Sequence, residues 1–108
     1  MPNGVLELDW DAGNLNHIAR HNVTREEAEQ TISGESLDIE LQIAGDGESE
    51  GRLLQVGETD NGRILQLLTT WRRGKVRVIS AWDAPKLLKS YYLAEMRRRH
   101  GSSEDSEV

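Results

Sequence analysis

Polar and hydrophobic residues alternate most regularly in the middle of the chain. The stretch SLDIELQI at residues 36–43 places every second side chain on the same face, which is the pattern of a half-buried β-strand. Three further strand-like runs follow, at residues 53–56, 63–71 and 75–82. Asn61-Gly62 and Arg73-Gly74 separate the last three runs and favour tight turns. The pattern therefore predicts an antiparallel meander.

Helical spacing of hydrophobic residues is found on both sides of this meander. Helices are expected at residues 11–21, 24–33 and 83–101, after a short strand at residues 5–10. Asp11 and Asp83 are suited to cap the first and last of them. Thr24 and Glu27 have the spacing of a capping box for the second. Gly101 is expected to end the last helix.

The predicted order of elements is β-α-α-β-β-β-β-α. It is typical of an α+β domain, here an antiparallel β-meander with helices packed on one face. Residues 1–101 are expected to form this single domain, and residues 102–108 a disordered acidic tail. Residues 44–51 (AGDGESEG) are expected to be a flexible acidic loop.

The composition of the chain excludes several kinds of site and several classes of protein. The chain has 108 residues and no cysteine, which excludes disulfides, thiolate zinc sites and a cysteine nucleophile. Its first residues lack the pattern of a signal peptide, and no apolar run approaches the ~20 residues that span a bilayer. No glycine-rich phosphate loop of the Walker type is present. We expect a cytoplasmic protein that needs no metal or other cofactor and does not bind a membrane.

Charge is distributed very unevenly along the chain. Residues 1–51 carry a balance of −10 and residues 52–100 a balance of +7, within a net charge of −6. The second half could present a cationic surface to a polyanion such as nucleic acid. The alternative is that the two halves neutralise each other within the fold.

Basic side chains gather around the turn at Arg73-Gly74. Arg72, Arg73 and Lys75 flank this turn, and Arg77 follows on the last strand. Arginine suits a phosphate ligand because its planar, permanently charged group donates two parallel hydrogen bonds. The alternative is an ordinary solvated sheet face.

Alternation on the last strand predicts which side Arg77 faces. If Val76, Val78 and Ser80 point into the core, Arg77 points outward with Ile79 and Ala81. Arg63 and Arg72 could then meet Arg77 across the meander.

Other candidate site residues could transfer protons or stack on a nucleic-acid base. His17 and His21 lie one helical turn apart and could be an acid–base pair, because histidine as a residue type suits this role. The alternative is that His21 caps the C-terminus of its helix and that His17 lies on the surface. Tyr91 is expected to be partly exposed and Tyr92 to be in the core. Trp82 could stack on a base or pack in a core or interface.

Taken in order, several residues resemble the BrnT family. They are Trp10-Asp11, Asn14, His21, Val23 and Glu26-Glu27-Ala28 near the start, Arg52-Leu53, Gly57, Gly62-Arg63 and residues 76–81 in the middle, and Tyr91-Tyr92 near the end. The resemblance covers about residues 6–96. The chain differs from the family at Ser80-Ala81-Trp82, where members commonly have Ser-Ala-Arg, and at Pro85 and Leu87-Leu88.

The resemblance implies a RelE-like fold and a type II toxin. Such a toxin is a metal-independent ribonuclease that inhibits translation, and a ribbon-helix-helix antitoxin neutralises it. The expected assembly is a homo-oligomer or a heterotetramer with the antitoxin. Arg77, Arg72, Arg73, His21 and Tyr91 are then the candidate catalytic residues, and Arg63, Lys75, Ser80 and Trp82 the candidate RNA-binding residues. The alternative is a catalytically weak or inactive module of the same fold that binds an acidic partner protein.

Overall fold

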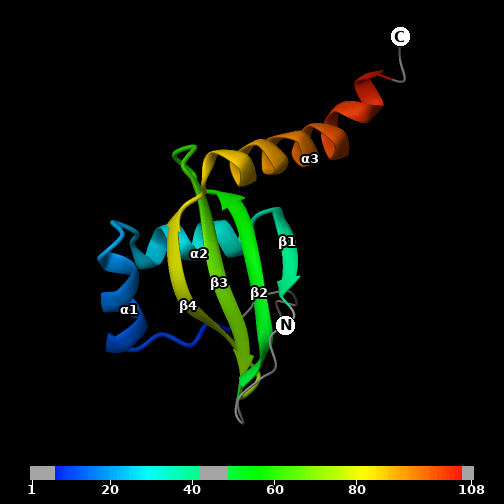
Figure 1. The fold of residues 1–108 in the computed structure, drawn as a ribbon. Helices are drawn as coiled ribbons and strands as arrows, with labels where there is room; N and C mark the ends of the chain where they lie inside the picture. Colours follow the sequence, from blue (N-terminus) through cyan, green and yellow to red (C-terminus); the bar gives the residue numbers. More distant parts are fainter. Residues whose placement is uncertain (1–6, 42–48, 106–108) are drawn as a thin grey trace.

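The computed structural model describes residues 7–41 and 49–105. It contains a single antiparallel sheet in the order β1-β2-β3-β4 (Figure 1). The strands are β1 Ser36–Leu41, β2 Ser49–Glu58, β3 Ile64–Arg72 and β4 Lys75–Asp83. The predicted meander and the α+β class are therefore confirmed. Residues 49–51, expected in a loop, begin β2 instead, and residues 42–48 of that expected loop lie outside the described residues.

Three helices accompany the sheet, namely α1 Ala12–Ala19, α2 Arg25–Ser33 and α3 Lys86–Asp105. Asp11 and Thr24 cap the first two, each within a complete capping box. Gly101 does not end α3, because an isolated glycine costs a helix only about 1 kcal/mol relative to alanine. None of the helices in the described ranges is long and apolar enough to cross a membrane.

The first hydrophobic core lies between the sheet and the helices α1 and α2. In Figure 1, α2 runs behind the sheet and α1 lies beside β4 at the left. Ile18 of α1 and Ala28 of α2 are almost fully buried against Leu65 and Leu67 of β3. Val78 of β4 completes this layer. The predicted inward positions of α2, which are Ala28, Thr31 and Ile32, are confirmed as buried.

A second, smaller core lies on the opposite face of the sheet, under α3. Val56 and Ile64 belong to this face, because they alternate with Gly57 and Leu65 of the first face. Tyr92 of α3 covers them and is buried, as predicted. The expectation that all helices share one face was therefore wrong for α3, because apolar residues on the second face also need cover.

Helix α3 covers only one end of that second face, and no helix in the described part of the chain covers the rest (Figure 1). We call the uncovered part the open face. Strand alternation and pairing assign to it Arg52 and Leu54 of β2, Gln66, Leu68, Thr70 and Arg72 of β3, and Lys75, Arg77, Ser80 and Trp82 of β4.

Gly57 marks the closest approach of α2 to the sheet. A Cβ atom at this position would lie 2.9 Å from Thr31 Cγ2 and 3.0 Å from the Thr31 carbonyl oxygen. We therefore expect Gly57→Ala to lower the free energy of unfolding by about 1–3 kcal/mol through overpacking, measured by denaturant unfolding. Gly101→Ala is the control, since its Cβ would meet Arg97 Cγ at an ordinary 3.5 Å. Equal stability of Gly57→Ala and wild type would contradict this packing.

Candidate functional site

A β-bulge decides which residues of β4 share the open face. Thr70 pairs with Arg77 and Leu68 pairs with Ser80, so Ile79 has no partner on β3. A bulged residue shifts the alternation of side chains by one position. Arg77 and Ser80 therefore point to the same side of the sheet, although simple alternation predicted opposite sides.

The same shift brings Trp82 to the open face, where it pairs with Gln66. Ala81, expected outside, is fully buried in the first core. The prediction that Ser80 faces that core was wrong for the same reason, although Ser80 is itself buried, with 6% of its surface exposed.

The β3–β4 hairpin carries the basic end of the open face. Arg72 pairs with Lys75, and Thr70 with Arg77, so Arg72, Lys75 and Arg77 lie on one side as neighbours. Arg73 occupies the turn itself with a positive φ of 56°. The expected gathering of cations around this turn is present on a single face.

Arg77 is held at the edge of the sheet by two carboxylates. Its Nη1 lies 3.0 Å from Asp11 Oδ2 and 3.5 Å from Asp9 Oδ2, and its Nη2 donates to Asp11 Oδ1 at 3.3 Å. Nη1 is buried and its ion pair is not aligned as a hydrogen bond. The Arg77 guanidinium, through its hydrogen bond above all, lowers the pKa of Asp11 below its usual value.

Asn14 holds the segment that carries these two carboxylates next to Arg77. Its side-chain amide donates to the carbonyl oxygens of Asp9 at 2.9 Å and Val78 at 3.1 Å. This buried amide therefore fixes the start of α1 against β4. The strand expected at residues 5–10 was wrong for the described residues 7–10, which form only an isolated parallel bridge between Leu8 and Val76 at the sheet edge.

Arg63 does not join the other cations. Its Nε and Nη2 donate to Asp83 at 2.8 and 3.3 Å, and its Nη1 donates to Glu27 at 3.0 Å and to the Asn22 carbonyl at 2.7 Å. These partners lie at the α1–α2 junction and at the end of β4, away from the hairpin. The suggested meeting of Arg63 with Arg72 and Arg77 was therefore wrong, because Arg63 has the opposite alternation on β3.

Three aromatic rings line up at the other end of β4. The ring centroids of His17 and His21 are 5.8 Å apart, and those of His21 and Trp82 are 5.9 Å apart. His21 is exposed and Trp82 is partly exposed, so their rings are accessible from solvent. Trp82 lies five residues from Arg77, a separation on the order of 15 Å along a strand.

Tyr91 is on α3, with 56% of its surface exposed. Helix α3 packs over the end of the sheet opposite the β3–β4 hairpin (Figure 1). The structure therefore separates the candidate residues into the hairpin cations, the His21–Trp82 rings and an isolated Tyr91.

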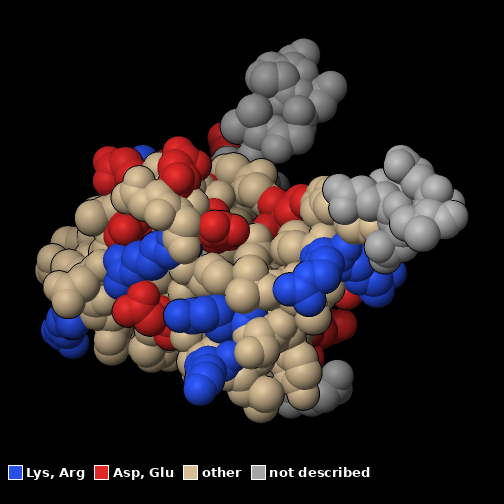
Figure 2. Space-filling view, turned by 90° about the horizontal axis from the view of Figure 1, so that it is seen from above, with Lys and Arg blue, Asp and Glu red and all other residues tan. Residues whose placement is uncertain are grey.

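Charges from the two halves of the sequence are mixed in the fold. Besides the pairs of Arg63 and Arg77 with acidic residues of the first half, Arg99 lies 4.0 Å from Glu35 and His100 also contacts Glu35. In the view from above, Lys and Arg groups are separated by acidic and uncharged ones (Figure 2). The fold therefore neutralises part of the charge of the two halves, and it also has a basic end at the β3–β4 hairpin.

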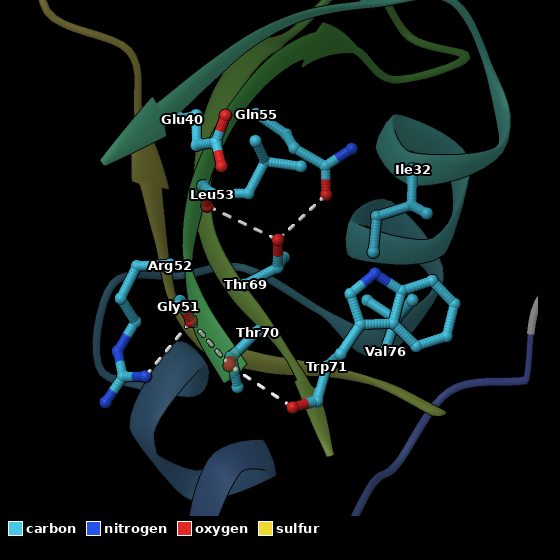
Figure 3. A pocket seen from close by; sticks show the side chains of 10 residues that line it. All are labelled: Ile32, Glu40, Gly51, Arg52, Leu53, Gln55, Thr69, Thr70, Trp71 and Val76. Carbon is cyan, nitrogen blue, oxygen red and sulfur yellow. Dashed lines mark hydrogen bonds between the residues drawn. The ribbon is translucent and has the colours of Figure 1, made fainter. Parts of the chain in front are cut away.

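A cavity of ≈ 380 Å³ lies on the face covered by α2, beyond the end of that helix (Figure 3). Ile32, Leu53, Trp71 and Val76 supply most of its apolar wall. Arg52 and Thr70 also contribute to the lining of this cavity, whereas Arg77 does not. No cluster of three or more metal-ligating side chains occurs within residues 7–41 and 49–105.

Two residues of the open face were missed from the sequence as site candidates. Arg52 follows the irregular start of β2, and Thr70 stands between Arg52 and Arg77 on the central strand. The sequence signal that could have indicated Arg52 was its place in the basic half of the chain. Its position opposite Arg77 depends on the pairing of three strands.

Comparison with known proteins gives one family. The family model described as "Ribonuclease toxin, BrnT, of type II toxin-antitoxin system" matches residues 10–86, which include the whole sheet and exclude nearly all of α3. A search of curated proteins found no match. Because the match covers most of the chain, this protein belongs to the BrnT family of type II toxin–antitoxin ribonuclease toxins.

Proposed function

We propose that this chain is a toxin that cleaves RNA without a metal ion, with the RNA bound on the open face. The observation that carries the proposal is the bulge at Ile79, since it places Ser80 and Trp82 on the side that already holds Arg72, Lys75 and Arg77. A row of cations beside an accessible indole matches a single-stranded RNA, which offers phosphates and unstacked bases.

The proposed reaction uses the RNA's own 2′-hydroxyl as the nucleophile. A bond forms between the 2′-oxygen and phosphorus, and the bond from phosphorus to the 5′-oxygen breaks. The products are a 2′,3′-cyclic phosphate and a 5′-hydroxyl. Negative charge accumulates on the phosphoryl oxygens in the transition state, and fixed cations stabilise it.

Arg77 is the residue that best fits this stabilising role. It is 18% exposed, and Asp9 and Asp11 orient its guanidinium from one side. A preoriented donor does not have to reorganise when the charge develops. Arg72 and Lys75, on the same face, add positive charge around the same phosphate.

His21 and Trp82 are proposed to contact a different nucleotide of the bound strand. Their rings lie on the order of 15 Å along β4 from Arg77, too far to act on the same phosphorus. Base stacking on aromatic side chains contributes about 1–3 kcal/mol per base. Trp82, where family members commonly have arginine, therefore replaces a phosphate contact by a stacking contact.

The partner proposed for this toxin is a ribbon-helix-helix antitoxin. The family itself implies an antitoxin. We add to this that the antitoxin is of the ribbon-helix-helix type and that the target of the toxin is RNA. The proposal also includes inhibition of translation and a cytoplasmic location. The alternative is an interaction module with little activity. It is favoured by the carboxylates of Asp9 and Asp11, which already occupy one side of Arg77.

Expression of the chain alone tests this proposal. We expect growth arrest, and we expect the purified protein to cleave single-stranded RNA in excess EDTA, leaving 2′,3′-cyclic phosphate ends. Co-expression with the antitoxin encoded beside it should restore growth. Normal growth together with intact RNA would instead favour the interaction module, and cleavage that EDTA abolishes would remove metal independence.

A further inference from the structure

We propose that the side-chain amide of Asn14 positions both the guanidinium of Arg77 and the β4 bulge at Ile79. The inference rests on the proposed function for the reaction that these groups serve. Asn14 has only 4% of its surface exposed, so it acts through other residues and not by contact with RNA. It is therefore a positioning residue, and the sequence singled it out only through its resemblance to the family.

Asn14 uses both donors of its amide and its side-chain carbonyl oxygen. Its Nδ2 donates to the carbonyl oxygens of Asp9 at 2.9 Å and Val78 at 3.1 Å, and its Oδ1 accepts from the backbone N–H of Asp11 at 2.8 Å. An amide nitrogen carries two hydrogens, so both are engaged. Turning the amide over would place its nitrogen against the Asp11 N–H, and the side chain therefore has one orientation.

The amide continues a ladder of hydrogen bonds along the outer edge of β4. The N–H of Val76 donates to the Glu7 carbonyl at 3.0 Å, and the N–H of Asp9 donates to the Val76 carbonyl at 2.8 Å. Backbone carbonyls two residues apart on a strand point to the same side, so the next one at this edge is that of Val78. Asn14 bonds to it, in a buried place where a carbonyl without a partner would destabilise the fold.

The two carboxylates that hold Arg77 belong to residues whose backbones bond to Asn14. The Oδ2 atoms of Asp9 and Asp11 lie 3.5 and 3.0 Å from Arg77 Nη1. Asn14 bonds to the carbonyl of the first residue and to the N–H of the second. It also bonds to Val78, which follows Arg77 on β4. Asn14 therefore fixes the carboxylates and the strand relative to each other, which sets the direction of the guanidinium.

The contact with Val78 also lies at the bulge. Val78 is the last residue that pairs with β3 before the extra residue Ile79. A bulge breaks the regular ladder of a strand pair, so the backbone there depends on other partners. Asn14 supplies one on the side of β4 that faces away from β3. We therefore expect it to maintain the bulge and, with it, the position of Trp82 on the open face.

Two variants separate the amide from the rest of the residue. Asn14→Ser removes both donors to Asp9 and Val78 and adds no charge. Asn14→Asp keeps the size of the side chain and replaces its nitrogen by an oxygen that repels both carbonyls, which provides a second test if the smaller serine leaves the protein unfolded. Asn16→Ser and Asn16→Asp are the matched controls, because Asn16 is exposed on the same helix. Circular dichroism establishes the temperature range in which each variant is folded.

The pKa of Asp11, followed by NMR of its carboxyl carbon, reports on Arg77 without any RNA. Arg77 lowers this pKa in the wild type, first of all through its hydrogen bond. In Asn14→Ser we expect the pKa to rise toward its value in Arg77→Ala, and in the double variant we expect no further rise. Asn16→Ser should leave it unchanged. An unchanged pKa of Asp11 in folded Asn14→Ser would overturn the inference, whether or not the protein cleaves RNA.

Single-turnover cleavage at saturating RNA tests the same role within the proposed function. We expect Asn14→Ser and Asn14→Asp to lower this rate by about 10–10²-fold, since a small displacement of a catalytic group can cost as much as about 10²-fold. Neither change should lower it further in Arg77→Ala, because residues that act as one unit are not additive. The two Asn16 variants should cleave at the wild-type rate.

Affinity for a single-stranded oligoribonucleotide with 2′-O-methyl groups, which cannot be cleaved, reports on the bulge. Asn14→Ser should weaken this binding, and the loss should be smaller when the same change is made in Trp82→Ala. Fluorescence anisotropy of the labelled oligonucleotide measures both losses.

The outcomes separate this inference from the proposed function. Equal losses of cleavage in the wild-type and Arg77→Ala backgrounds would show that Asn14 only stabilises the fold. Equal losses of affinity in the wild-type and Trp82→Ala backgrounds would reject its effect on the bulge. A raised pKa of Asp11 in Asn14→Ser, together with a wild type that leaves RNA intact, would support the positioning of Arg77 and reject the nuclease.

Discussion

Arg77→Ala is expected to lower the rate of RNA cleavage by about 10²–10³-fold, the usual cost of one preoriented donor to a charged transition state. The guanidinium of Arg77 is fixed on the open face by contacts to Asp9 and Asp11. Because this charge acts mainly in the transition state, kcat should fall more than KM changes. Single-turnover cleavage of a labelled RNA measures the effect directly.

Two further variants separate charge from geometry. Arg77→Lys keeps the charge but loses the fork, so we expect it to recover only part of the lost rate. Asp11→Asn removes one carboxylate partner and retains a residue that caps helices equally well. Its cleavage rate should fall, but by less than that of Arg77→Ala, because Arg77 loses part of its orientation and keeps its charge. Full activity of a folded Arg77→Ala protein would remove Arg77 from the mechanism.

Arg63→Ala is expected to lower the free energy of unfolding by about 2–3 kcal/mol, since hydrogen bonds to charged groups contribute about 1.5–3 kcal/mol each before solvent screening. Arg63 joins Glu27 of α2, the Asn22 carbonyl and Asp83 at the end of β4. Its side chain is 25% exposed and Asp83 is 66% exposed, so the Asp83 pair contributes the smaller part. Thermal unfolding should shift downward by roughly 10–20 °C.

Arg25→Ala provides the matched control. Arg25 forms an i,i+4 pair with Glu29 and is 54% exposed, so its removal should cost less than about 0.5 kcal/mol. Similar losses for the Arg63 and Arg25 variants would show that the Arg63 contacts contribute no more than a surface pair.

The contribution of Arg63 should also depend on pH. The backbone N–H of Thr24, and then Arg63, lower the pKa of Glu27 below its usual value, and Arg63 lowers that of Asp83. A lowered folded-state pKa means that the stabilisation is complete above the unfolded pKa, about 4 to 4.5, and is lost as pH falls through the folded pKa. The stability difference between wild type and Arg63→Ala should therefore shrink below about pH 4. A constant difference down to pH 2 would exclude these carboxylates as the partners that matter.

Local sequence signals accounted for much of the fold. Thr24 and Glu27 predicted the capping box that starts α2, since both groups lie within one turn of the chain. Asn61-Gly62 and Arg73-Gly74 predicted two turns, and Gly62, Arg73 and Gly74 do have positive φ angles. The cationic character of the second turn was visible for the same reason, because its residues are neighbours in sequence.

The candidate site depended on contacts between distant segments. The bulge at Ile79 has no signature in the sequence, yet it moves Ser80 and Trp82 to the face of Arg77. Arg63 looked equivalent to Arg72 and Arg77, and it was the position of Glu27 and Asp83 that gave it a structural role.

By itself, the sequence determined most of the helices and strands, two of the turns and the number of arginines, because each of these depends on residues within a few positions of one another. Only the tertiary structure decided which arginines lie together and which carboxylates hold them. The physical reason is that a side chain's face and partners depend on strand register. One extra residue in β4 reverses the face of every residue that follows it.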